Sequence, residues 1–247
     1  MSGHSKWATI KHKKAALDAK RGKAFTRLIK EIMIAARSGG DPDMNPRLRT
    51  AIVAAKAESM PADNIKRAIM RGTGELEGGQ LDEILFEGYG SGGAAVLVNV
   101  ATDNRNRTVS EIRHMFSKNG GNLGEQGSVA WMFERKSQIV VDAENANEDR
   151  LMTIVLDAGA DDLRDHGGAW EILSAPEAHE TVVKALEKAR IPTESAEIAM
   201  VPKNTVKLEG KNAQAMLRLY DTLEEHDDVQ NVYGNYEVDE AEVEAMA

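Results

Sequence analysis

Apolar positions in the first third of the chain recur with the spacing of α-helices. One stripe advances by three or four residues at a time: Phe25, Leu28, Ile29, Ile32, Met33 and Ala36. Such a repeat places all of these side chains on one face of a helix. Gly39 and Gly40 follow the stripe and are expected to end this helix.

Two more short helices are predicted before the pattern changes. Asn45 followed by Pro46 is typical of a helix start, because asparagine caps free amides and proline suits the first turn. Pro61 is expected to begin the next helix and Gly72 to end it. The expected inward positions are Leu48, Ile52 and Val53 in the first of these helices and Ile65 and Ile69 in the second. Three short helices with short links predict a small bundle, followed by a linker at residues 73–80.

Short apolar runs typical of β-strands replace the helical spacing beyond this linker. Strands are expected at residues 83–88 and 94–101, joined by a glycine-rich turn. A helix at residues 108–117 and a strand at residues 129–133 are expected next.

The elements that follow alternate in a regular order. The expected strands cover residues 139–142, 162–163, 169–174 and 194–201, and the expected helices cover residues 148–158 and 176–189. This β-α-β-β-α-β order is that of the ferredoxin-like unit. A strand at residues 205–208, a helix at 212–225 and a strand at 229–238 complete the chain.

The strands before residue 134 have no partners nearby in the sequence, and the final elements could supply them. The sequence therefore predicts an α+β fold with three domains: a three-helix bundle, a discontinuous α/β domain and an inserted ferredoxin-like domain. The expected boundaries are residues 1–75 for the basic arm and bundle, 80–133 plus 203–239 for the α/β domain, 134–202 for the insert and 240–247 for an acidic tail.

Charge is distributed very unevenly along the chain. The formal net charge is −9, from 31 Lys and Arg against 40 Asp and Glu. Residues 1–71 hold 16 basic and 6 acidic residues, a charge of +10, whereas the remaining 176 residues hold 15 and 34, a charge of −19. A concentrated basic segment on an acidic body indicates a polyanionic partner, and nucleic acid is the most plentiful cellular polyanion.

Residues 1–23 form a basic arm without a strong hydrophobic period. The residues predicted to neutralise phosphates are Lys6, Lys11, Lys13, Lys14, Lys20, Arg21, Lys23 and Arg27. Trp7 and His12 lie among them and could stack on an unpaired base or hydrogen-bond to it. The alternative is a solvated run of charge that only aids solubility. The single sign of the charge and the neighbouring aromatic residue favour binding.

A second anion site is predicted at residues 103–108, between a strand and a helix. Thr108 or Asn106 is the expected cap, and Arg105 and Arg107 would point the same way as the free amides of the helix start. A capped loop with surface arginines is the alternative, and the sequence supports the two equally.

Composition and spacing argue against catalysis and metal binding. Hydrophobic residues make up 42% and charged residues 29% of the chain, as in ordinary globular proteins. With no cysteine, disulfides and thiolate metal sites are excluded. The acidic cluster at residues 157–166 matches no calcium loop, and the glycine runs at 88–93 and 120–128 lack the features of phosphate-binding loops. We therefore expect no enzymatic activity, metal, cofactor or small-molecule substrate.

The hydropathy pattern also bears on location. No apolar stretch approaches the roughly 20 residues of a membrane span, and the N-terminus lacks the apolar centre of a secretory signal. We expect a cytoplasmic monomer that does not contact membranes.

Several strings of residues, in order along almost the whole chain, closely resemble the YebC family. They are Gly3-His-Ser-Lys-Trp, Ile10-Lys-His-Lys-Lys, Asp18-Ala-Lys-Arg-Gly-Lys, Gly40-Asp-Pro, Asn45-Pro-Arg-Leu-Arg, Met60-Pro-Ala-Asp-Asn-Ile, Glu87-Gly-Tyr-Gly, Asp103-Asn-Arg-Asn-Arg-Thr, Gly120-Gly-Asn-Leu-Gly and Gly127-Ser-Val-Ala-Trp. The family also includes the mitochondrial translational activator of cytochrome c oxidase. The resemblance begins at Gly3, so we expect no cleaved leader. Ser91 stands where the family usually has proline, which loosens that turn.

The resemblance implies the same three-domain fold, no enzymatic activity and two pictures of function. One is a DNA-binding transcriptional regulator. The other is a ribosome-associated factor that helps synthesis through difficult stretches, notably consecutive prolines. We expect the second, with ribosomal RNA or the ribosome as partner, because the arm has no element shaped for a major groove. DNA stays the alternative, and a nucleotide-binding enzyme and a protein-binding adaptor are weaker hypotheses.

Overall fold

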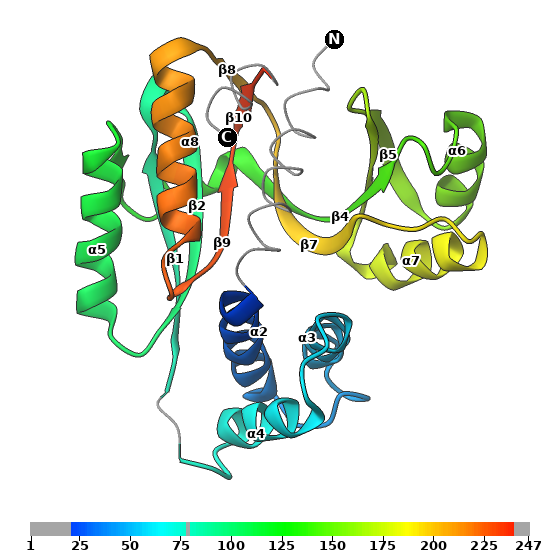
Figure 1. Ribbon diagram of the computed structural model, residues 1–247, viewed down its shortest axis with the longest axis horizontal. Coiled ribbons are helices and arrows are strands. Elements are labelled where there is room, and N and C mark those ends of the chain that lie inside the picture. The colour runs from blue at the N-terminus through cyan, green and yellow to red at the C-terminus, as the bar shows by residue number, and fades with distance from the viewer. Residues whose placement is uncertain (1–20, 78–79, 240–247) are drawn as a thin grey trace.

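A computed structural model describes residues 21–77 and 80–239 of the chain, and its helices and strands confirm a mixed α+β fold (Figure 1). The arm up to residue 20 and the C-terminal residues 240–247 lie outside the described residues. Figure 1 shows three groups of elements: helices α2 to α4 at the bottom, a sheet with α5 and α8 on the left, and a second sheet with α6 and α7 on the right.

The N-terminal group consists of α2 (Arg21–Ala36), α3 (Pro46–Ala57) and α4 (Ala62–Thr73). Its core is small and mostly aliphatic, with Ile32, Leu48 and Ile65 buried at the centre. Asn45 caps α3 as predicted, because its side chain accepts a hydrogen bond from Leu48 N at 3.1 Å. The same side chain donates to the carbonyl oxygen of Ala35, so one residue starts α3 and ties it to α2.

Two expectations about these helices are wrong. Val53 is 62% exposed and faces solvent, while the small residues Ala51 and Ala55 make the buried contact of α3. Gly72 does not end α4, which continues to Thr73 and closes at Gly74 in the left-handed conformation, with φ of 84°. Gly72 instead allows close packing, because a Cβ there would lie 2.4 Å from the carbonyl oxygen of Met33 on α2.

The first sheet has the strand order β3-β1-β2-β9 and is antiparallel throughout. Its strands are β1 (Asp82–Tyr89), β2 (Ala95–Thr102), β3 (Asn122–Leu123) and β9 (Val229–Gly234). A single turn of 3-10 helix, η1 (Ser91–Gly93), joins β1 to β2, which confirms that the glycine-rich run is a hairpin turn. The pairing of β9 with β2 confirms that a C-terminal strand completes the sheet begun before residue 134.

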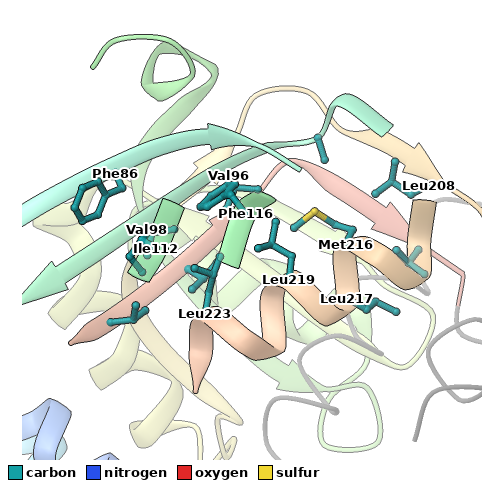
Figure 2. Close-up of a cluster of buried hydrophobic side chains, with 14 of the residues drawn as sticks. Phe86, Val96, Val98, Ile112, Phe116, Leu208, Met216, Leu217, Leu219 and Leu223 are labelled. Carbon is teal, nitrogen blue, oxygen red and sulfur yellow. The ribbon is translucent and has the colours of Figure 1, made fainter. Parts of the chain in front are cut away.

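Helices α5 (Arg105–Lys118) and α8 (Gly210–Glu224) cover one face of this sheet. Figure 2 shows the core between them, where Val96 and Val98 of β2 meet Ile112 and Phe116 of α5 and Met216, Leu219 and Leu223 of α8. The opposite face of β2 is also covered, since Ala95 and Leu97 pack with Val129 and Phe133. Burial on both faces explains why β2 is a continuous apolar run rather than an alternating one.

The second sheet has the strand order β5-β6-β4-β7. Its elements are β4 (Phe133–Asp142), α6 (Glu148–Asp157), β5 (Ala160–Asp165), β6 (Ala169–Ser174), η3 (Pro176–Ala178), α7 (His179–Lys188) and β7 (Ser195–Pro202). The succession of β4, α6, β5, β6, α7 and β7 is the β-α-β-β-α-β order predicted. Both helices pack on the same core as Ile139 and Ile172.

Two predicted strands have a different form in the structure. Of the strand predicted at residues 129–133, only Phe133 is in a strand, as the first residue of β4, because η2 (Ala130–Met132) precedes β4. The strand expected at 229–238 is divided into β9 and β10 (Tyr236–Val238), and β10 pairs in parallel with β8 (Val206–Leu208). The break falls at Asn235, whose side chain accepts a hydrogen bond from Ala95 N at 2.6 Å.

We propose that the three groups of elements are the three domains expected from the sequence, with the boundaries given there. The polypeptide leaves the first sheet before β4 and returns to it after β7, which supports a discontinuous α/β domain with an insert. Among the helices that the structure describes, none is long and apolar enough to cross a membrane.

Candidate nucleic-acid interface

Most of the predicted phosphate-binding residues precede the described part of the chain. The predicted contacts that lie outside the described residues are Lys6, Trp7, Lys11, His12, Lys13, Lys14 and Lys20. Arg21 is the first residue of α2, and Lys23 is half-buried two residues later. The arm therefore leads directly into the helix that joins the bundle to the rest of the molecule.

Arg27 faces the α/β part of the molecule rather than open solvent. Its guanidinium group lies 2.8 Å from the carboxylate of Glu224 on α8, and the two side chains are only 15% and 14% exposed. Arg27 also donates to the backbone carbonyl of Glu224. The guanidinium is thus paired within the protein, and a phosphate contact at Arg27 remains a proposal that requires competition with Glu224.

Lys30, one turn further along α2, makes a second connection of the same kind. Its ammonium group donates to Asp228 Oδ1 at 2.8 Å and to the carbonyl oxygens of Ala101 and Asp227 at 3.0 Å each. These three acceptors lie at the end of β2 and immediately before β9. Together with Arg27, Lys30 fixes α2 against the end of the sheet where β2 ends and β9 begins.

Asp228 is the centre of this connection and is 5% exposed. Besides Lys30, its carboxylate accepts from Arg107 at 2.8 Å, Thr108 at 2.8 Å and Thr102 at 3.0 Å. Burial alone would raise the pKa of Asp228, but the hydrogen bonds from Lys30, Arg107 and Thr108 hold this pKa far below its usual range. The carboxylate is therefore charged at any physiological pH.

The start of α5 differs from the predicted anion site. Asn104 is the cap, because its side chain accepts from Arg107 N at 3.1 Å, so the expectation of Thr108 or Asn106 is wrong. Thr108 is buried and bonds to Asp228 instead. Its hydroxyl donates to Asp228, immediately before β9, which leaves the capping role to the side chain of Asn104, the residue before the helix.

The two arginines of the predicted second site have different environments. Arg107 is surrounded by carboxylates at 2.8 Å (Asp228), 3.2 Å (Asp103) and 3.8 Å (Glu111). Its hydrogen bond to Asp228 raises the pKa of Arg107 above its ordinary value. Arg105 is exposed, and within the described residues it has no ion pair or side-chain hydrogen bond. Side chains two positions apart on a helix do not face each other, so Arg105 and Arg107 of α5 are not expected to act at one point. Their contact with phosphate remains a proposal.

The acidic cluster considered as a metal site is used in ion pairs of the second sheet. Asp161 lies 2.9 Å from Lys136, and Asp162 lies 2.7 Å from Arg164. His166 hydrogen-bonds to the buried Glu171 at 3.0 Å. In residues 21–77 and 80–239, no group of three or more histidine or acidic side chains could hold a metal ion.

Lys30, Asp228 and Glu224 could not be recognised from the sequence as members of one cluster. Lys30 and Asp228 are separated by 198 positions, and neither belongs to a motif. The sequence offers two hints: Arg27 and Lys30 lie on one face of a basic helix, and the C-terminal part of the chain is acidic and could pair with them.

Two family models match this chain. The model described as the TACO1/YebC protein N-terminal domain covers residues 5–75, and the one described as the TACO1/YebC second and third domain covers residues 81–236. The chain belongs to the TACO1/YebC family. This membership confirms the resemblance found in the sequence motifs.

Named relatives in the TACO1/YebC family match along the whole chain. A probable transcriptional regulatory protein of Solibacter usitatus is 74% identical over 247 residues, which is all of both chains. A protein of the same description from Geobacter sulfurreducens is 57% identical, again over all of both chains. The crystal structure of a conserved hypothetical protein from Aquifex aeolicus is similar, with a TM-score of 0.81, 47% identity, and coverage of 90% of this chain and 92% of the other.

Proposed function

We propose that this member of the TACO1/YebC family is a non-enzymatic regulator of gene expression that binds nucleic acid through its basic arm. The observation that carries the proposal is the division of charge, +10 over residues 1–71 and −19 over the rest. The names of the relatives, probable transcriptional regulatory proteins, support a role in gene expression.

Several basic residues of the bundle are already paired with acidic residues of the protein, which favours the arm as the contact. Arg27 and Lys30 pair with Glu224 and Asp228, and further along the bundle Arg47 pairs with Glu31 and Glu83. These cations already have acidic partners inside the protein. In the sequence, positions 6–23 carry 7 basic residues and a single acid, Asp18. The surplus of positive charge is therefore densest in the arm and the first turn of α2.

The acidic body sets the orientation of binding. Phosphate groups around the binding site repel the negative remainder of the chain and attract the arm, so the charge dipole turns the arm toward the nucleic acid. The pairs at Arg27 and Lys30 hold α2 against the acidic elements and fix the point from which the arm leaves.

We propose ribosomal RNA as the target and relief of stalled translation, for example at consecutive prolines, as the activity. A basic segment with Trp7 and His12 among its lysines suits irregular RNA, where unpaired bases are accessible for stacking and phosphates lie at many angles. The alternative is a transcriptional regulator on duplex DNA, which the names of the relatives favour.

Fluorescence anisotropy with a labelled ribosomal RNA hairpin, a duplex DNA and a random RNA tests the proposal. Neutralising about six phosphates gives a plot of log affinity against log salt with a slope of about −4 to −5. Tighter binding to RNA than to DNA supports the translation role, and a preference for particular promoter DNA supports the alternative. Salt-independent or absent binding to all three contradicts both.

A further inference from the structure

Trp131 is exposed to an extent that packing does not explain. It lies in η2 between the two sheets and is 64% exposed, whereas Trp170 in the second sheet is 9% exposed. Its neighbours Ala130 and Met132 pack against the apolar cluster at the junction of the sheets. The backbone around Trp131 is therefore anchored at the junction of the two sheets, while the indole ring is exposed to solvent.

A buried carboxylate holds the backbone around Trp131 in place. Glu87 on β1 is 4% exposed, and its side chain accepts hydrogen bonds from the amides of Gly127 at 2.6 Å, Val129 at 2.8 Å and Ala130 at 2.7 Å. Burial would raise the pKa of Glu87, but these three donors lower it below its ordinary value. A charged carboxylate thus orders the turn that ends at Trp131.

The indole ring is also fixed along one edge. Its Nε1 donates to the carbonyl oxygen of Ser128 at 3.1 Å, and the hydroxyl of Tyr89 donates to the same oxygen at 3.1 Å. The ring is therefore held in one orientation although most of its surface is open. Holding an aromatic group in its bound geometry lowers the entropy lost when a ligand stacks on it.

A cation lies at the backbone of Trp131. Lys203, in the connection after β7, is exposed and donates from Nζ to the carbonyl oxygen of Trp131 at 2.9 Å. An exposed aromatic ring and a cation held at the backbone of the same residue are the two kinds of group that contact an unpaired base and its phosphate. An apolar pocket of a protein partner would use the indole but would have no need of the lysine.

We propose that Trp131 is a stacking platform for an unpaired RNA base and that Lys203 holds the phosphate beside that base. This is a second nucleic-acid contact, separate from the basic arm, and it rests on the proposed function. A contact at η2 in addition to one through the arm would fix the orientation of the protein on a structured RNA more firmly than the arm alone.

Binding of a labelled 12-nucleotide single-stranded RNA to the full chain tests this proposal. Trp131→Ala weakens binding roughly 5- to 150-fold, the range found when a base-stacking aromatic is removed. Trp131→Phe keeps a ring for stacking and retains most of the affinity. Leu156→Ala, which removes another exposed apolar side chain (49% exposed, on α6), leaves affinity unchanged. Thermal unfolding of each variant verifies that the fold is intact.

Lys203→Met adds a test of the cation, with Lys188→Met, an exposed lysine on α7, as its control. A loss of affinity with Lys203→Met alone supports the proposal.

Two results would overturn the stacking platform but leave the proposed function standing. One is an equal loss of RNA affinity for Trp131→Ala and Trp131→Phe. The other is no loss for Trp131→Ala while Lys11→Glu still weakens binding. If the wild type does not bind RNA at all, the proposed function fails first. If Trp131→Ala abolishes binding of a protein partner but leaves RNA affinity unchanged, Trp131 is a protein-docking residue and the proposal is overturned.

Discussion

The ammonium group of Lys30 on α2 lies 2.8 Å from Asp228 Oδ1, just before β9, and joins the N-terminal helices to the first sheet. A parallel connection runs from Arg27 to Glu224 at the end of α8. Both cations belong to the basic segment of the chain, and both anions belong to its acidic part. The basic and acidic parts of the chain therefore pair with each other through α2, close to the point where the arm begins.

Lys30→Met is expected to lower the free energy of unfolding by roughly 1.5–3 kcal/mol, because it removes a charged hydrogen-bond donor from a buried carboxylate. Urea unfolding at neutral pH measures this loss. Lys56→Met, an exposed lysine on α3, is the matched control and should change stability by less than about 0.5 kcal/mol. Similar losses in the two variants would mean that the Lys30 pair is not structural.

The charge of Asp228 predicts a dependence of stability on pH. The folded-state pKa of Asp228 is lower than that of an unfolded aspartate, near 3.9, so its contribution is complete above about pH 4 and is lost as the pH falls further. Asp228→Asn should therefore be less stable than the wild type at pH 7, and the difference should shrink below about pH 4. Urea titrations from pH 7 to pH 3 give both curves. Asp157→Asn, at an exposed position of α6, should follow the wild type, and a constant gap for Asp228→Asn at all pH values would contradict the account.

The cap of α5 can be tested by a pair of asparagines two positions apart. Asn104→Ala removes the side chain that accepts from Arg107 N and should cost about 1 kcal/mol of stability. Asn106→Ala changes an exposed position inside the helix and should be neutral or slightly stabilising, because alanine favours helices. Chemical denaturation of both variants distinguishes the two positions, and a larger loss at Asn106 would contradict the structure.

Glu87→Gln tests the turn before β4. The amide group replaces an acceptor oxygen with a donor that faces backbone amides, which should cost about 1–3 kcal/mol and speed hydrogen exchange at Val129 and Ala130. Glu125→Gln, at an exposed position of the same loop, should leave both quantities unchanged. NMR hydrogen exchange on the two variants reports the local effect separately from global stability. Unchanged protection at Val129 and Ala130 in Glu87→Gln would show that the carboxylate does not order this turn.

Elements set by local periodicity could be predicted from the sequence. The apolar stripe of α2, the cap at Asn45 and the alternation of strands and helices from β4 to β7 depend on neighbours within one turn or one strand. The turn at residues 130–132 could not be predicted in this way. Its apolar run has the composition of a strand, but Glu87, 43 positions before Ala130, draws its backbone amides together.

The candidate site, too, could be predicted only as far as it depends on neighbours in the sequence. The basic arm is visible as composition, so its class of partner could be inferred from charge alone. The pairing of Arg107 with Asp228 spans 121 positions and redirects a side chain expected to meet phosphate. Only the folded arrangement shows which cations have acidic partners already.

The most direct test of the central claim, that the arm binds ribosomal RNA, is sedimentation of cell lysate through sucrose gradients at low and moderate salt. The variant with Lys11, Lys13 and Lys14 changed to glutamate is compared with one carrying the same changes at Lys118, Lys188 and Lys211, exposed lysines of α5, α7 and α8. The account predicts that the wild type and the helix variant sediment with ribosomes at low salt and that the arm variant stays at the top. A wild type that stays at the top at both salt concentrations, or two variants that behave alike, would contradict it.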